Sequence, residues 1–152
     1  MRSSVNMTTF ITLPFGPSAA DPTTFASDNP EFFPVDNRLF GNETVDGLSH
    51  NYYFSVAFAI NFRYRGGETF YLASDDDSWM FINRQLAVDL GGPHQVLGGS
   101  VDLDANRQNL GISVGQVYTM NVFYADRYPI SAVLDVDVPA TDFAVCSDGG
   151  IP

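Results

Sequence analysis

The sequence predicts an all-β protein, an antiparallel two-sheet β-sandwich with an irregular N-terminal segment. The main observation is the alternation of apolar and polar residues from Phe54 to Tyr64, the period-2 pattern of a long strand with one buried face. Shorter β-prone runs separated by turn signals follow it, as in sandwiches and barrels. No stretch has the period of a long amphipathic helix, which disfavours the helical fold classes.

The N-terminal segment, residues 1–48, holds five of the nine prolines among many Ser, Asp and Asn residues, a composition typical of extended loops. We expect it to pack on a β-sandwich core formed by residues 49–140. A C-terminal tail or linker, residues 141–152, follows and contains the only cysteine, Cys146, so its disulfide partner is unknown. At 152 residues these parts amount to one domain.

The strands are expected in a regular order. The first ends at Gly66-Gly67, and others follow near 70–72, 79–82, 86–90, 100–103, 117–124 and 133–138. Trp79 lies inside a strand, so we expect it to pack in the core. The Asn83-Arg84 connection suits a two-residue turn, but a type I′ turn would require a positive φ at Arg84; a rearranged or longer turn is the alternative. The alternation places one set of side chains inside the sandwich: Phe54, Val56, Phe58, Ile60, Phe62, Leu134 and Val136.

Composition and short motifs argue against nucleic-acid binding, membrane spanning and catalysis. The net charge is −11 and there is no lysine, which argues against nucleic-acid binding but suits cations. No apolar run is long enough to span a membrane. Two sequons, at Asn6 and Asn42, weakly support secretion. Only His50 and His94 are near-neutral bases, and neither lies in a recognisable Ser or Cys triad context, so we expect no enzyme activity.

Three consecutive aspartates, Asp75, Asp76 and Asp77, interrupt two stretches that are otherwise typical of buried strands. On a regular strand Asp75 and Asp76 would point to opposite faces and could not bind one target together. The run therefore indicates either a plain acidic turn or a break in the strand geometry that lets neighbouring carboxylates converge.

Four segments together resemble the fibro-slime domain: YRGGETFYLASDDDSWMFINRQLAVDLGGPH, GGSVDLD, LGISVGQVYTMNVFYADR and, upstream, NPEFF. That domain is a branch of the lectin-like β-sandwich superfamily, which includes the anthrax protective-antigen-type domain and the fungal flocculins. The likeness extends from about Asn29 to Val138. It implies an extracellular or cell-surface module of an adhesion or matrix protein, with other domains of a larger protein as possible neighbours.

The resemblance also implies a calcium site. In the lectin members two consecutive aspartates, joined by a cis peptide, bind a Ca²⁺ ion that holds the sugar. Aligned on the Phe-Ile-Asn motif that ends at Asn83, this pair corresponds to Asp75 and Asp76, while Asp77 stands where a glycine is common and its role stays open. The second ion-binding loop corresponds to YADRYPIS and adds Asp126 to the candidate metal ligands.

The same alignment suggests the residues around the ion. Arg127 could donate to sugar hydroxyls and Tyr128 could stack on a pyranose face, although an ordinary exposed loop is the alternative. Four further motif residues are expected mainly to fix loops by hydrogen bonds: Asp89, His94, Asp102 and Asp104.

The function implied by the resemblance is Ca²⁺-dependent binding of a carbohydrate with vicinal hydroxyls, through Asp75, Asp76, Arg127 and Tyr128. Ca²⁺ accepts about 6–8 oxygen ligands at flexible angles, which leaves positions for such hydroxyls. The alternative is a structural module that assembles an extracellular matrix or filament by protein contacts, with calcium only stabilising loops.

Overall fold

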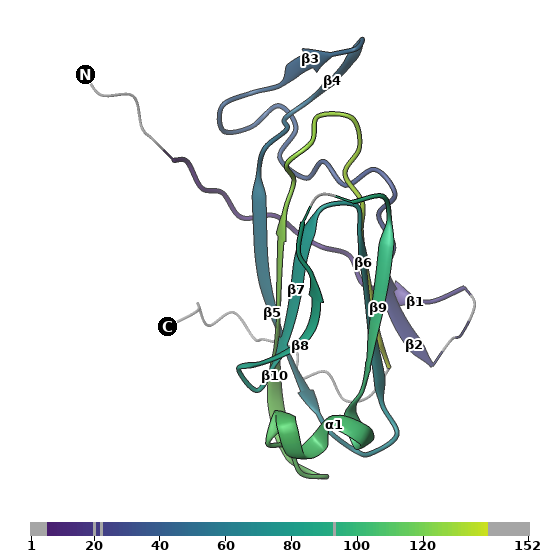
Figure 1. Ribbon diagram of the computed structural model, residues 1–152. Coiled ribbons are helices and arrows are strands. Elements are labelled where there is room, and N and C mark those ends of the chain that lie inside the picture. The colour runs from purple at the N-terminus through teal and green to yellow at the C-terminus, as the bar shows by residue number, and fades with distance from the viewer. Residues whose placement is uncertain (1–5, 20, 22, 93, 140–152) are drawn as a thin grey trace.

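Two antiparallel sheets face each other in the computed structural model, which describes residues 6–19, 21, 23–92 and 94–139 (Figure 1). The predicted all-β sandwich is therefore confirmed. The five-stranded sheet has the order β1 (Gly16–Pro17), β2 (Thr24–Ser27), β11 (Leu134–Pro139), β6 (Thr69–Ser74) and β9 (Leu97–Asp102). The four-stranded sheet has the order β5 (Ser55–Arg63), β10 (Val117–Ala125), β7 (Asp77–Ile82) and β8 (Gln85–Leu90).

The core lies between the sheets and contains the residues expected from the alternation. On β5, Val56 and Phe62 are buried, while Phe58 and Ile60 are half-buried and pack against the core. Phe54 just before this strand is buried too, as are Leu134 and Val136 of the facing sheet. The alternation predicted the inward face correctly, because every second side chain of a strand lies on the same face and only one face can bury the apolar side chains.

Trp79 does not pack in the core, and this expectation is wrong. Its neighbours Met80 and Ile82 are fully buried, so the pleat directs Trp79 and Phe81 to the outer face of the four-stranded sheet. There Trp79 lies opposite Phe123 of β10. The side chain is half-exposed and lies close to Gly91, where an added Cβ would approach its indole nitrogen to 3.3 Å.

A short helix, α1 (Leu103–Leu110), closes one end of the sandwich (Figure 1). The sequence predicted a strand as far as Leu103, but β9 ends at Asp102 and the helix begins at Leu103. Asp102 caps the helix, since its Oδ1 accepts the Ala105 N–H at 2.9 Å. Gly111 ends the helix in the left-handed conformation. The helix caps the core with Leu103 and Leu110, both buried.

The N-terminal segment contains more regular structure than its prolines suggest. β1 and β2 join the five-stranded sheet next to β11, and β3 (Glu43–Val45) pairs with β4 (Leu48–His50) in a separate hairpin at the end opposite α1 (Figure 1). Residues 6–15 run extended and pack on the core through Ile11, Leu13 and Phe15. The tail, with Cys146, lies outside the described residues.

The connection between β7 and β8 keeps its two-residue form, so the rearranged or longer alternative does not occur. Ile82 pairs with Gln85, and the two residues between them have positive φ, 49° at Asn83 and 65° at Arg84. The Asn83 side chain donates to the Leu110 carbonyl at 2.8 Å, which ties this turn to the end of α1.

Candidate functional site

The aspartate run forms the crossing between the two sheets. Ser74 ends β6 in one sheet and Asp77 begins β7 in the other, so Asp75 and Asp76 are the whole connection. The Ser74 hydroxyl fixes it by lying 2.7 Å from both the Asp76 carbonyl oxygen and the Ser78 hydroxyl. The strand geometry is thus interrupted at this point, as one of the two interpretations of the run required.

The expected cis peptide is absent: every peptide bond among the described residues is trans, including that between Asp75 and Asp76. The two carboxylates nonetheless reach the same loop, residues 126–133. Asp75 accepts hydrogen bonds from the Val133 N–H at 2.9 Å, the Ser131 hydroxyl at 2.7 Å and the Tyr124 hydroxyl at 3.3 Å. The backbone N–H groups of Arg127 and Tyr128 donate to Asp76 Oδ2 at 2.8 and 3.2 Å.

Asp77 has a separate role, which the sequence left open. Its Oδ1 accepts the Gly92 N–H at 2.6 Å, and its Oδ2 forms an ion pair with Arg127 Nη1 at 2.8 Å. Burial alone would raise the pKa of Asp77, but these bonds and the Arg127 charge outweigh it and lower the pKa. Asp77 therefore holds two loops, those at 92 and 127, beside the Asp75-Asp76 connection.

Asp126 is buried, as are the three aspartates of the run. Its side chain accepts the Tyr53 N–H at 2.7 Å through Oδ2, whereas the buried Oδ1 has no hydrogen-bond partner. Burial, followed by the negative charges of Asp76 and Asp75, raises the pKa of Asp126 to about 6. Burial also raises the pKa of Asp76, and the charges of Asp75 and Asp77 add to this. The loops have thus concentrated negative charge that protein donors neutralise only in part.

These carboxylates suit a hard cation in their chemistry, since Ca²⁺ prefers oxygen ligands and Asp126 Oδ1 is a buried acceptor without a donor. Both oxygens of Asp75 already accept hydrogen bonds from the 124–133 region, so Asp76 and Asp126 offer the more available oxygens. Within the described residues, no group of three or more Asp, Glu, His or Cys side chains is placed so that it could hold a metal ion by itself. An ion here would need further oxygens from carbonyls, water or a ligand.

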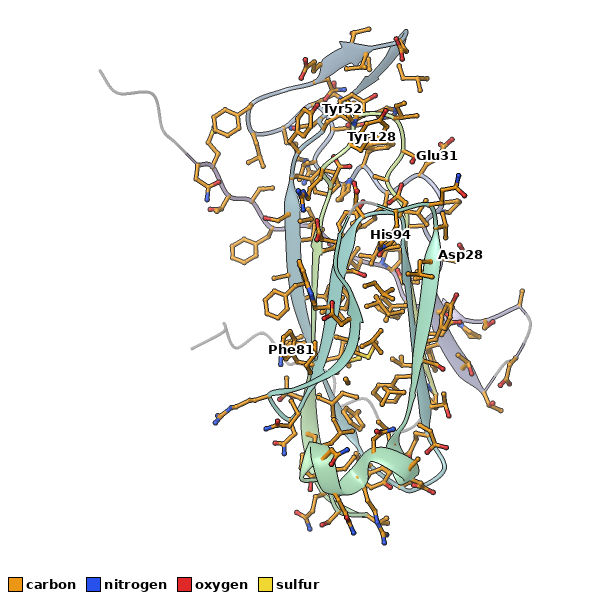
Figure 2. The ribbon with its side chains drawn as sticks, viewed as in Figure 1. Asp28, Glu31, Tyr52, Phe81, His94 and Tyr128 are labelled. Carbon is orange, nitrogen blue, oxygen red and sulfur yellow. The ribbon has the colours of Figure 1, made fainter. Side chains whose placement is uncertain are left out.

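A pocket of about 510 Å³ opens beside the connection. Three of the residues predicted from the sequence line it: Asp75, Asp76 and Tyr128. Asp126 is not among the lining residues, and the Arg127 guanidinium is directed to Asp77 rather than into the pocket. Figure 2 shows Tyr128 and His94 at the same end of the sandwich, the end opposite α1. The exposed Tyr128 ring is the one aromatic surface that the lining offers within the described residues.

Ile130 and Ser131 also line the pocket, and both belong to the 126–131 loop that the sequence predicted to touch the sugar. Three further lining residues were not identified as ligand-contacting from the sequence: His94, Gln95 and Val96. His94 was expected to fix a loop, and it does so, since its backbone N–H donates to the Asp75 carbonyl at 3.2 Å. The remaining loop-fixing expectations also hold. Asp89 accepts the Gly91 N–H at 3.0 Å, and Asp104 accepts the Tyr64 hydroxyl and the Gly67 N–H.

Comparison with known proteins places the site inside a recognised domain. The family model described as the PA14 domain matches residues 17–141, which include the aspartate run and the loop it binds. Among curated relatives, protein psiJ of Dictyostelium discoideum is 34% identical over 96% of this chain and 22% of its own length. Protein psiI of the same organism is 36% identical over 75% of this chain and 16% of its own length, and protein psiE, also from it, is 32% identical over 83% and 27%.

The chain thus spans about a fifth of the length of the first of these relatives. No solved structure matches the chain at a significant level. Within the described residues, no helix is long and apolar enough to cross a membrane.

Proposed function

This chain belongs to the PA14 domain family, a carbohydrate-binding-like module of adhesion and secreted proteins, and on that premise we propose that it binds a glycan in the Asp75-Asp76 pocket with the help of Ca²⁺. The observation that carries the proposal is the buried Asp126 oxygen without a partner, next to two further carboxylates at the wall of an open pocket. A buried ionised group of this kind is costly unless a cation or a donor neutralises it.

Asp76 and Asp126, with Asp75, would hold the ion. When bound, Ca²⁺ would supply positive charge and open coordination positions for vicinal sugar hydroxyls. The chain itself supplies the walls. The loop N–H groups that donate to Asp76 fix the direction of its carboxylate, and Ser131 does the same for Asp75.

The sugar would meet an aromatic and a cationic group at the rim. Tyr128, with its exposed ring on the pocket wall, suits stacking on a pyranose face. The Arg127 guanidinium is held by Asp77 outside the pocket lining, and its side chain is 57% exposed, so its remaining donors would reach the part of a glycan that extends beyond the pocket. A small ligand held by so few contacts should bind with a Kd of about 0.1–10 mM.

We further propose that the chain represents the fibro-slime branch of its family, on the strength of the DDDSWMFIN motif, and that it is a non-catalytic module exposed outside the cell. Weak binding of a single sugar would then become useful through many copies on one surface, since a high effective concentration multiplies weak contacts.

A glycan array read in millimolar Ca²⁺ and again in excess chelator tests the proposal. We expect binding only with Ca²⁺, and loss of binding in Asp76→Ala and Asp75→Asn. Arg127→Ala should retain the ion but weaken binding several-fold. Asp46→Asn, an exposed acid in the β3–β4 turn, is the matched control and should bind as the unmodified protein does. Ca²⁺ should also raise Tm in the unmodified protein and not in Asp76→Ala.

Two results would overturn the proposal. One is glycan binding that persists in chelator and in both aspartate variants. The other is a blank array from a folded protein whose Tm does not respond to Ca²⁺.

A further inference from the structure

The edge strand β5 carries a row of backbone groups that its own sheet does not use. Asp126 donates to the Phe54 carbonyl and Tyr64 donates to the Gln116 carbonyl, at the two ends of the β5–β10 ladder. Because hydrogen-bonded positions alternate in an antiparallel pair, the even-numbered residues of β5 bond to β10. The N–H and C=O groups of the odd-numbered residues from Ser55 to Asn61 therefore point away from the sheet.

The other outer strands of the two sheets carry features that protect an edge from pairing. β1 has two residues and includes Pro17, and β8 carries Asp89 and pairs with β7 through a register shift. β9 contains Gly98-Gly99 and ends at Asp102. β5 is nine residues long and has no proline, bulge or charged residue before Arg63. By this comparison β5 is the edge most open to another strand.

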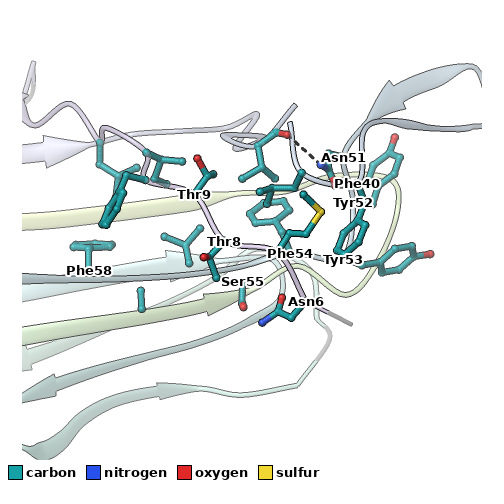
Figure 3. A pocket seen from close by; sticks show the side chains of 18 of the residues that line it. Asn6, Thr8, Thr9, Phe40, Asn51, Tyr52, Tyr53, Phe54, Ser55 and Phe58 are labelled. Atoms are coloured by element: carbon teal, nitrogen blue, oxygen red, sulfur yellow. Dashed lines mark hydrogen bonds between the residues drawn. The ribbon is translucent and has the colours of Figure 1, made fainter. Parts of the chain in front are cut away.

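A groove of about 790 Å³ runs along this edge (Figure 3). Six consecutive residues of β5, Ser55 to Ile60, line it, so the backbone edge itself faces the groove. Residues 6–15 form the other wall. In the described part of the chain, the backbone of residues 7–15 makes no hydrogen bond with the backbone of residues 55–62. Large apolar side chains are exposed on the lining, Phe10 by 91% and Phe40 by 66%. Such exposure of apolar side chains around a groove is typical of an interaction surface.

We propose that β5 pairs with β5 of a second copy of this chain, antiparallel across a two-fold axis at Ala59. The odd-numbered positions then exchange hydrogen bonds, with Ala59 opposite Ala59 of the second copy and Ala57 opposite Asn61 of the second copy. On the core side, Phe58 faces Ile60 and Val56 faces Phe62. The strand is complementary to itself: on the outer face Ala59 meets Ala59 and Ala57 meets the uncharged Asn61, on the inner face apolar residues meet, and no like charges meet. This surface is separate from the aspartate pocket and does not depend on the proposed function.

The net charge of −11 on each copy opposes the association, so the dimer should tighten as salt screens the repulsion. Sedimentation analysis of protein made in a bacterial host, which leaves the sequons unmodified, should show a concentration-dependent doubling of mass that is larger at 0.5 M than at about 0.1 M NaCl. Ala57→Pro removes an outward N–H that no internal bond uses, and should leave a folded monomer.

The register can be tested by cysteine crosslinking in a Cys146→Ser background. Ala59→Cys places two thiols in directly opposed positions, where Cα atoms are about 5.5 Å apart and a disulfide can form. Ala57→Cys is the matched control, because residue 57 faces residue 61 and its counterpart lies too far away. We expect rapid oxidation to a covalent dimer for Ala59→Cys and none above background for Ala57→Cys. A protein that stays monomeric at all concentrations and salt levels, or equal crosslinking of both variants, would overturn the proposal.

Discussion

Asp126 shows at the scale of one residue how the fold buries a carboxylate with one oxygen left without a donor. It is not among the residues that line the pocket, and its other oxygen accepts the Tyr53 N–H. Its position could be predicted only from the resemblance, because nothing in a lone Asp-Arg-Tyr triplet tells a buried acid from an exposed one. The positions of Ser131 and His94 likewise could not be predicted from local sequence, because their contacts with Asp75 connect loops that are distant in sequence.

The raised pKa of Asp126 predicts a pH dependence of stability without Ca²⁺. A carboxyl whose folded pKa, about 6, lies above its unfolded value near 3.9 stabilises the fold below the unfolded pKa, and this contribution is lost as pH rises through 6. Asp126→Asn removes the titrating carboxyl, so the variant should not lose stability in this way as the pH rises. The Tm of the variant minus that of the unmodified protein, both in chelator, should therefore be larger at pH 7 than at pH 4.5. An equal difference at both values would contradict the assigned burial.

The position of Trp79 could not be predicted from the residue type alone. An aromatic residue in a strand was expected inside, but strand alternation around the fully buried Met80 and Ile82 directs it outward. The register of the strand, set by the whole inward-facing row, outweighs the preference of one large side chain.

At the scale of elements, the alternating strands could be predicted and the short helix could not. β5 and β10 have long, regular alternation, and their observed bounds differ from the expected ones by about a residue. α1 has eight residues, of which only Leu103 and Leu110 are buried, so its sequence has no extended apolar stripe. The cap at Asp102 is visible in the sequence only once the end of β9 is known.

The β7–β8 turn carries a measurable strain. Arg84 has φ 65°, a conformation that costs a non-glycine residue about 1–2 kcal/mol, while glycine adds about 0.5–1 kcal/mol of chain entropy to the unfolded state. Arg84→Gly should therefore stabilise the protein by about 0.5–1 kcal/mol in denaturant unfolding. Gln85→Gly, the next residue and already in β8, is the control and should destabilise it. A loss of stability in Arg84→Gly would show that the arginine side chain contributes more than its backbone costs.

At the scale of the whole molecule, the fold places its two candidate interaction surfaces on different elements. The pocket lies where the β6–β7 crossing meets the 126–133 loop, at the end opposite α1, and the groove runs along β5. The architecture followed from strand alternation, whereas the strands in residues 16–27 were missed because they are short and are held in the sheet through β2, which pairs with β11 from the other end of the chain. Long-range pairing of this kind leaves no local pattern.

The central claim, that an ion and a glycan bind together at the aspartate pocket, is tested most directly by amide NMR spectra of the ¹⁵N-labelled protein. Ca²⁺ should be added first, and then a glycan that the array selects. We predict that Ca²⁺ shifts the signals of residues 75–77 and 126–131, and that the glycan then shifts Gln95, Val96, Tyr128 and Ser131 only when Ca²⁺ is present. Spectra that do not change with Ca²⁺, or glycan shifts confined to residues 6–15 and β5, would contradict the account.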